Sequence, residues 1–210
     1  MYWLLAILFI GLSVFRPFPF SWLIKITPIA ILLLFVTLSP TKLFPKLLKY
    51  GLAFSLLGDF ILDFFEEKGF VFGLAAFFIA HIFYIICFFP WKIQSPPIPI
   101  AIATLIYGTG VVVLISPNLG PLAIPVYAYM AILFSMTLAA LFSNRSNRWL
   151  AVGAISFLLS DSIIGINKFY WSFDYSDLLI MSSYYAAQYG LIKGFSGAST
   201  QATSPDNQKD

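Results

Sequence analysis

The segment Tyr50–Phe65 reads YGLAFSLLGDFILDFF, and it decides the fold because it is a membrane-length apolar run with an aspartate, Asp59, inside it. An ionisable side chain near the centre of a transmembrane helix costs about 2.5–3.5 kcal/mol on insertion scales. A second segment, Gly153–Phe169 (GAISFLLSDSIIGINKF), repeats the arrangement around Asp161. The sequence therefore predicts a frame of helices that brings two carboxylates together within a membrane.

The composition of the whole chain agrees with this environment. The 210 residues are 60% hydrophobic and only 10% charged, with a mean hydropathy of +0.90, whereas soluble domains carry about 25% charged residues. Helices satisfy every backbone hydrogen bond inside lipid, and the sequence lacks the alternating segments of about ten residues that build a membrane β-barrel. We therefore expect an all-α, polytopic membrane protein.

Eight apolar segments, separated by short connections rich in Pro, Gly, Asn and Ser, are the predicted spans. A span needs about 20 residues, and short connections make consecutive helices antiparallel neighbours. We expect residues 1–195 to form an eight-span bundle and residues 196–210 to form a disordered polar tail. The first segment lacks a basic start and a cleavage site, so we interpret it as a span and not as a signal peptide. The spans are roughly Tyr2–Phe15, Phe20–Leu38, Leu47–Phe65, Phe70–Phe89, Pro97–Ile115, Pro121–Phe142, Trp149–Phe169 and Asp177–Lys193.

Charged residues divide between the two ends of this predicted bundle. One end carries most of the cations, namely Lys42, Lys46, Lys49, Lys92, Arg145, Arg148 and Lys193. The opposite end carries three cations and most of the acidic loop residues, namely Arg16, Lys68, Lys168, Glu66, Glu67, Asp174 and Asp177. The positive-inside rule then predicts that both termini are cytoplasmic, in the inner or plasma membrane if the host is a bacterium.

A shift of 102 residues superimposes the two aspartate segments, because it lays Gly51 on Gly153 and Asp59 on Asp161. This match predicts two four-helix halves, residues 1–95 and 96–195, related by an axis along the membrane normal. The alternative is a chance match between two apolar helices.

Asp59 and Asp161 are the candidate catalytic residues. Two carboxylates in one low-dielectric pocket should not both ionise, because burial and mutual repulsion each favour a protonated form. The result is one acid and one base at neutral pH, which suits general acid–base catalysis. The alternative is a structural pair, each member satisfied by a serine, a lysine or the backbone of a neighbouring helix.

Polar residues on the same and adjacent spans are candidates for substrate binding. Asp63 shares a helix face with Asp59, but it lies nearer the water and is interpreted as a solvated helix end. Lys168 is placed to meet a phosphate at the membrane interface, or simply to snorkel. His81 could equally be a core residue whose ring is hydrogen-bonded within the protein. The hydroxyl and amide groups of the other candidates could form hydrogen bonds that hold neighbouring helices together. The full set is Ser55, His81, Tyr84, Asn167, Lys168, Tyr184, Tyr185 and Gln188.

Several other chemistries find no support in the sequence. One histidine and one cysteine, Cys87, argue against a zinc site built on His and Cys ligands, and we expect no metal or organic cofactor. A Ser–His–Asp triad would have to recruit His81, and the chain has no G-x-S-x-G, P-loop or G-x-G-x-x-G motif. The net charge of +3 does not indicate nucleic acid, because the basic residues lie in short loops.

Four segments stand out by their order and spacing: GLAFSLLGDFIL (51–62), GLAAFFIAHIFYIICF (73–88), GAISFLLSDSIIGINKF (153–169) and SSYYAAQYGLI (182–192). Together they resemble the YhhN-like lysoplasmalogenase family. The resemblance implies an eight-span membrane hydrolase, because family members with known activity cleave the vinyl-ether bond of lysoplasmalogens. It implies a lysophospholipid substrate, a membrane-lipid setting, and fatty aldehyde and glycerophosphoethanolamine or glycerophosphocholine as products.

The same resemblance implies roles for individual residues. It makes Asp59 and Asp161 the catalytic aspartates, and it includes His81, Tyr84 and the run from Tyr184 to Gln188. A vinyl ether hydrolyses through an oxocarbenium ion, so one aspartate would supply a proton and the other would stabilise the cation, as in glycoside hydrolysis. The alternatives are a proton-coupled transporter, which broken helices at the aspartates would favour, and a non-catalytic scaffold.

Overall fold

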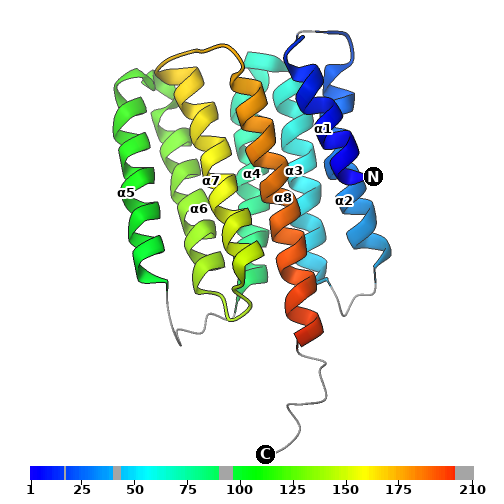
Figure 1. Cartoon of the computed structure of the whole chain (residues 1–210). Helices are drawn as coiled ribbons and strands as arrows, with labels where there is room; N and C mark the ends of the chain where they lie inside the picture. Colours follow the sequence, from blue (N-terminus) through cyan, green and yellow to red (C-terminus); the bar gives the residue numbers. More distant parts are fainter. Residues whose placement is uncertain (17, 40–43, 90–96, 202–210) are drawn as a thin grey trace, which may run out of the picture.

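A computed structural model of the chain describes residues 1–16, 18–39, 44–89 and 97–201, without the side chains of residues 66 and 197–201. Within these ranges eight α-helices follow one another, and two short 3₁₀ turns connect α5 to α6 (Figure 1). The helices are α1 (Tyr2–Ser13), α2 (Ser21–Leu38), α3 (Lys46–Phe64), α4 (Glu66–Phe88), α5 (Ile98–Ile115), α6 (Ala123–Phe142), α7 (Arg148–Phe169) and α8 (Ser176–Gln201).

The helices agree in number and order with the eight predicted segments, and the all-α prediction is confirmed. The largest difference is at the end of α8, which continues to Gln201 and so enters the segment predicted to be a disordered tail. Residues 202–210 of that tail lie outside the described residues.

The outer surface of the bundle suits a membrane. In the described part of the chain, five helices are long and apolar enough to cross a bilayer: α2, α4, α5, α6 and α7. The apolar α1 is shorter, and α3 contains two lysines and two aspartates. Large apolar side chains face outward on several helices, among them Ile7, Leu34, Phe35, Ile106, Val113 and Ile124. The chain is an integral, polytopic membrane protein.

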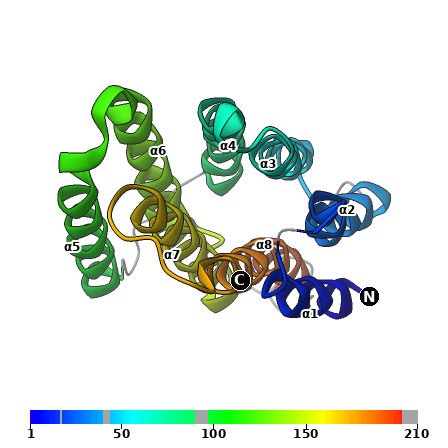
Figure 2. The ribbon, with the colours of Figure 1, turned by 90° about the horizontal axis from the view of Figure 1, so that it is seen from above.

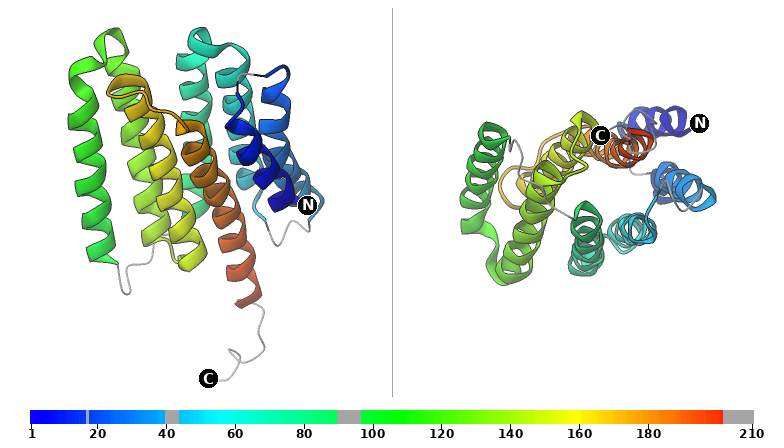
Figure 3. Two further views of the ribbon diagram at one scale, coloured as in Figure 1. Left: turned by 45° about the horizontal axis from the view of Figure 1, so that its top comes forward. Right: turned by 90° about the horizontal axis from the view of Figure 1, so that it is seen from below.

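The axes of all eight helices are roughly aligned, and consecutive helices run in opposite directions, so the bundle has two ends (Figures 1 and 3). The α1–α2, α3–α4, α5–α6 and α7–α8 connections lie at one end, here called the acidic end because it contains Glu67, Asp174 and Asp177. The other end, here called the basic end, contains Lys46, Arg145 and the C-terminal part of α8. The predicted separation of charges is therefore present among the described residues, while Lys42 and Lys92 lie outside them.

Seen along the helices, α1, α2, α3, α4, α6, α7 and α8 surround a common centre, and α5 packs outside on α6 and α7 (Figure 2). The α3–α4 and α7–α8 hairpins are the two most intimately packed helix pairs. Both carry an aspartate on their first helix, and both aspartates face the centre. The duplication of residues 1–95 as 96–195 stays a prediction, although the paired hairpins have the arrangement that it requires.

Glycines allow each hairpin to close, in two different ways. A Cβ atom added to Gly58 of α3 would lie 2.6 Å from the ring of Phe77 of α4. A Cβ atom added to Gly190 of α8 would lie 2.8 Å from the Cα atom of Gly153 of α7. Thus α3 and α4 pack through an aromatic ring, whereas α7 and α8 touch backbone to backbone.

Candidate active site

Asp59 lies on the face of α3 that points into the bundle. Its side chain is almost completely buried, with 3% of the residue exposed. The hydroxyl of Tyr184, on α8, donates a hydrogen bond of 2.6 Å to Asp59 Oδ2. The carboxyl group buried inside α3 is therefore hydrogen-bonded by the phenol of a residue 125 positions away in the sequence, which offsets part of the cost of its burial.

A chain of four hydrogen bonds ends at this carboxyl group. Ser55 Oγ lies 3.3 Å from the hydroxyl of Tyr84, which donates to Gln188 Oε1 at 3.0 Å. The amide of Gln188 then donates to the hydroxyl of Tyr184 at 3.2 Å, which donates to Asp59. Because Tyr84 has one proton and gives it to Gln188, the Ser55 hydroxyl is the donor in the first link. Every hydrogen bond of this series is therefore donated in the direction of Asp59.

Asp161 lies on α7 in a different environment. Its Oδ2 accepts a hydrogen bond from the hydroxyl of Tyr129, on α6. Asp161 is buried, with 9% of the residue exposed, and a run of contacting aromatic rings joins its donor Tyr129 to Tyr184, the donor to Asp59. The structure therefore brings the two predicted catalytic residues into one region, each with its own phenol donor.

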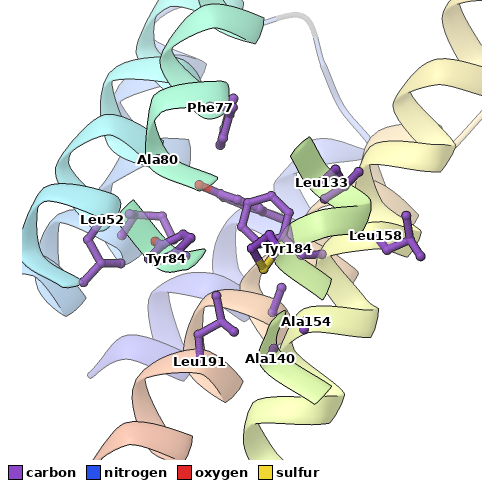
Figure 4. Close-up of a cluster of buried hydrophobic side chains, with 14 of the residues drawn as sticks. Leu52, Phe77, Ala80, Tyr84, Leu133, Ala140, Ala154, Leu158, Tyr184 and Leu191 are labelled. Atoms are coloured by element: carbon purple, nitrogen blue, oxygen red, sulfur yellow. The ribbon is translucent and has the colours of Figure 1, made fainter. Parts of the chain in front are cut away.

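Aromatic rings occupy the space around the two carboxyl groups. The ring of Phe157 lies 4.8 Å from that of His81 and 5.5 Å from that of Tyr184, measured between centroids. The His81 ring in turn lies 5.6 Å from that of Tyr129. In the close-up of the buried cluster, Phe77, Tyr84 and Tyr184 lie among apolar residues of the neighbouring helices (Figure 4). These rings bury the two carboxyl groups away from the protein surface, and aromatic faces of this kind can stabilise a nearby cation.

His81 is held in one tautomer. Its Nδ1 atom lies 2.7 Å from the carbonyl oxygen of Phe77, to which it must donate. Its Nε2 atom is buried and has no hydrogen-bond partner among the described residues. A neutral imidazole with this tautomer presents a free acceptor at Nε2, which can take a hydrogen bond from water or from a substrate hydroxyl.

An apolar cavity opens beside Asp161, which shares its lining with Tyr129. The cavity has a volume of about 40 Å³, which is sufficient for water. Every other lining side chain is apolar, and five helices contribute them: Leu62, Phe70, Leu74, Phe77, Val111, Ile115, Val126, Met130, Ile164, Gly165 and Phe169. Asp161 is therefore the carboxyl group that borders an apolar space, since Asp59 does not line this cavity.

Three of the predicted substrate-binding residues lie away from this network. The hydroxyl of Tyr185 donates to the carbonyl oxygen of Lys25 and so joins α8 to α2. The side chain of Asn167 accepts from the backbone N–H of Phe173, in the α7–α8 connection. Lys168 is exposed, and its Nζ atom lies 4.7 Å from the centre of the Phe70 ring at the edge of the cavity.

The interpretation of Asp63 as a solvated helix end is wrong. Its side chain is 6% exposed, and its Oδ1 atom accepts from Arg16 at 2.7 Å and from Lys25 at 3.1 Å. Arg16 also pairs with Asp177 at 3.0 Å. These four residues, here called the charged cluster, join the α1–α2 connection, α2, α3 and the first turn of α8 at the acidic end.

Tyr129, Phe157, Arg16 and Lys25 did not emerge as site residues from the sequence. Tyr129 belongs to a generic apolar helix, and its partner Asp161 is 32 positions away. No spacing rule connects residues on different helices, so this contact leaves no local signal.

The α3 and α7 helices run unbroken through Asp59 and Asp161, and they therefore lack the interruption that the transporter alternative predicts.

The fold and the site define the class of protein: a polytopic membrane protein with two buried aspartates at its centre. Within that class, the chain belongs to the YhhN family, whose model matches residues 20–195. No solved structure matches the chain.

Curated relatives support this membership. A Mycobacterium tuberculosis protein named lysoplasmalogenase is 35% identical over 152 residues, which are 69% of this chain and 58% of that protein. Lysoplasmalogenase TMEM86B of Rattus norvegicus is 33% identical over 178 residues, which are 80% of this chain and 71% of that protein. Lysoplasmalogenase TMEM86A of Homo sapiens is 33% identical over 189 residues, which are 80% and 75% of the two chains. The chain thus spans less than two thirds of the mycobacterial relative's length.

Proposed function

We propose that the protein is a lysoplasmalogenase, a membrane hydrolase that cleaves the vinyl-ether bond of lysoplasmalogens. The products are a fatty aldehyde and glycerophosphoethanolamine or glycerophosphocholine. The names of the relatives support this activity. The observation that carries the proposal is the pair of phenol-bound aspartates in an aromatic enclosure, one of which opens onto an apolar cavity.

Asp161 is assigned as the acid. It lies in apolar surroundings with a single phenol donor, and burial favours the protonated form of a carboxyl group. In the first step its proton moves to the vinyl carbon that is remote from the ether oxygen, and the π electrons form the new C–H bond. The adjacent carbon and the ether oxygen become an oxocarbenium ion, and Asp161 becomes a carboxylate. The alkenyl chain occupies the cavity, whose apolar side chains move apart to admit it.

Asp59 is assigned as the ionised partner, because hydrogen bonds to a carboxylate favour its charged form and the donor chain from Ser55 ends on it. Asp59 stabilises the cation and takes a proton from the water that adds to it, which yields a hemiacetal. His81 Nε2 accepts a hydrogen bond from the second hydrogen of that water, which stays on the oxygen as the hydroxyl of the hemiacetal.

Collapse of the hemiacetal restores both aspartates. Its hydroxyl proton passes to the Asp161 carboxylate as the C=O bond forms. The C–O bond to glycerol breaks, and the proton held by Asp59 moves to the departing oxygen. One water molecule is consumed, the aldehyde and the glycerol hydroxyl are released, and no metal or organic cofactor takes part.

The proposal includes an orientation, with the acidic end on the non-cytoplasmic side and both termini in the cytoplasm. The separation of charges between the two ends supports it. A protease-sensitive tag after residue 210 tests it in right-side-out and inverted vesicles. Cleavage in inverted vesicles alone is expected, and cleavage in right-side-out vesicles would reverse the orientation.

The activity is tested on purified protein in lipid nanodiscs. The substrate is an alkenyl lysophosphatidylethanolamine, and the matched control is the saturated alkyl ether of the same chain length, which lacks the double bond to be protonated. Release of fatty aldehyde and glycerophosphoethanolamine from the first compound alone is expected. Cleavage of neither compound, across ethanolamine and choline headgroups, would favour transport or scaffolding.

A further inference from the structure

We propose that the charged cluster of Arg16, Lys25, Asp63 and Asp177 is the binding site for the lipid's zwitterionic phosphoethanolamine headgroup. The phosphate would bind Arg16 and Lys25, and the ammonium group would bind Asp63 and Asp177. The inference rests on the proposed function, which supplies the lipid class. It goes beyond it by naming a headgroup site and a preference for ethanolamine.

The position of the cluster fits the length of the substrate. Asp63 follows Asp59 by one turn on the same face of α3, which places the two Cα atoms about 6 Å apart along the helix. In a lysoplasmalogen a single glycerol unit separates the vinyl-ether oxygen from the phosphate, and its extended length is similar. A vinyl ether held between the aspartates therefore brings its phosphate to the level of Asp63.

The order of chemical environments across the bundle matches the order of groups in the lipid. The lining of the cavity beside Asp161 is apolar, as the alkenyl chain is, and the cavity widens from its volume of about 40 Å³ to admit that chain. The two aspartates and the aromatic rings between them surround the reacting bond. The charged cluster begins one turn beyond Asp59, on the side of α1, α2 and α8. Chain, vinyl ether, glycerol and headgroup follow one another in the same sequence.

The cluster has hydrogen-bonding capacity that its own ion pairs do not use. Asp63 Oδ2 is buried and has no partner among the described residues, although its Oδ1 atom accepts from two cations. Among the described residues, Lys25 uses one of its three donors, on Asp63, and Arg16 uses two of its five. Unused donors therefore lie beside an unused buried acceptor. A phosphate group accepts hydrogen bonds and an ammonium group donates them, so a phosphoethanolamine group could pair with both.

The charge balance also fits a zwitterion. Two cations and two carboxylates give the cluster no net charge, as the phosphoethanolamine group has none. Removing the partner of a buried charge is strongly destabilising. A zwitterion can bind within the cluster and still leave every charge of the cluster with a partner of opposite sign. Arg16 and Asp177 are partly exposed, so the headgroup can enter from the acidic end.

An ethanolamine headgroup fits this site better than a choline headgroup. The ammonium group carries hydrogens that can donate to Asp63 Oδ2, whereas a trimethylammonium group has none and is bulkier. Lys168 is the rival phosphate site, since it lies at the edge of the cavity. It is a single cation, however, and among the described side chains no carboxylate that could receive the ammonium group pairs with it.

Binding measurements test the site independently of catalysis. The probes are 1-acyl lysophosphatidylethanolamine, its choline counterpart and the monoacylglycerol of the same chain, none of which contains a vinyl ether. The proteins are the wild type, Asp63→Asn, Arg16→Gln, the rival variant Lys168→Gln and the control Lys68→Gln, which removes an exposed cation at the same end. Dissociation constants are measured on protein in detergent micelles.

The wild type should bind the ethanolamine lipid at least tenfold more tightly than the other two probes. Asp63→Asn and Arg16→Gln should remove this preference while their affinity for the monoacylglycerol stays the same, which also shows that they fold. Equal affinities of the wild type for all probes, or loss of the preference in Lys168→Gln instead, would overturn the proposal. If the preference is found but no aldehyde forms from an alkenyl lipid, the proposed reaction fails and the headgroup site stands.

Discussion

The α3–α4 and α7–α8 hairpins carry the same residue at the same register but give it different surroundings. Asp59 receives the last link of a donor chain that begins at Ser55, and its side chain has no part in the apolar cavity. Asp161 has one phenol donor and lies at the cavity wall. The difference teaches that helix register places a carboxyl group at a given depth, whereas the neighbouring helices decide what that group can do.

Removal of either carboxyl group should have the largest effect. We expect Asp59→Asn and Asp161→Asn each to lower turnover of an alkenyl lysolipid about a thousandfold, which lies within the usual contribution of general acid–base catalysis. The matched control is Asp174→Asn, which makes the same change at an exposed position in the α7–α8 connection. Initial rates of aldehyde release measure the effect, and near-normal rates in both variants would remove the aspartates from the mechanism.

The two phenols should differ in importance, because one donates to an ionised partner and the other to a protonated one. Tyr184→Phe should lower turnover about 10- to 100-fold, since hydrogen bonds to charged groups contribute roughly 1.5–3 kcal/mol. Tyr129→Phe should lower it about 3- to 10-fold, as for a neutral hydrogen bond. Steady-state kinetics of both variants check this order, and the reverse order would exchange the roles of the two aspartates.

The two hairpins should also respond differently to an added methyl group. Gly153→Ala should destabilise the protein by about 1–3 kcal/mol, because the α7–α8 backbones cannot move apart without loss of packing. Gly58→Ala should cost less, because the Phe77 ring can rotate away. Thermal unfolding in detergent measures both, with Gly110→Ala as the control, since a Cβ atom there meets nothing within 4 Å. A greater loss from Gly58→Ala would show that the α3–α4 contact is the tighter one.

The smallest effect should come from Tyr84, which is three hydrogen bonds away from Asp59 in the donor chain. Tyr84→Phe removes the hydroxyl that donates to Gln188. We expect it to lower the free energy of unfolding by about 1 kcal/mol, the usual net contribution of a hydrogen bond. The control is Tyr127→Phe, whose hydroxyl bonds to Ser116 at the surface. Unfolding curves compare the two, and equal losses would mean that burial adds nothing to the network.

The fold was largely predictable from the sequence because each helix is a local apolar run bounded by Pro, Gly, Asn or Ser. The two aspartates were predictable for the same reason, since a charge inside such a run stands out. Tyr84, Tyr184 and Gln188 also followed from their spacing on α4 and α8, which places polar groups on one helix face.

Contacts between distant helices were beyond reach. Asp63 was misread because its partners, Arg16 and Lys25, are 47 and 38 positions away in the N-terminal part of the chain. Tyr129 was missed because nothing in its own helix distinguishes it from the exposed Tyr127. Helix packing, which no local pattern encodes, turns one of these tyrosines toward Asp161 and the other toward Ser116.

Isotopic labelling tests most directly whether a buried carboxylic acid protonates the vinyl ether and water then adds to the cation. The wild-type protein is given an alkenyl lysophosphatidylethanolamine in water labelled with deuterium and oxygen-18, and the products are analysed by mass spectrometry. We predict one deuterium on the aldehyde carbon next to the carbonyl group, and a glycerophosphoethanolamine that keeps its original ether oxygen without label. Oxygen-18 in the glycerophosphoethanolamine, or an aldehyde without carbon-bound deuterium, would contradict the proposed reaction.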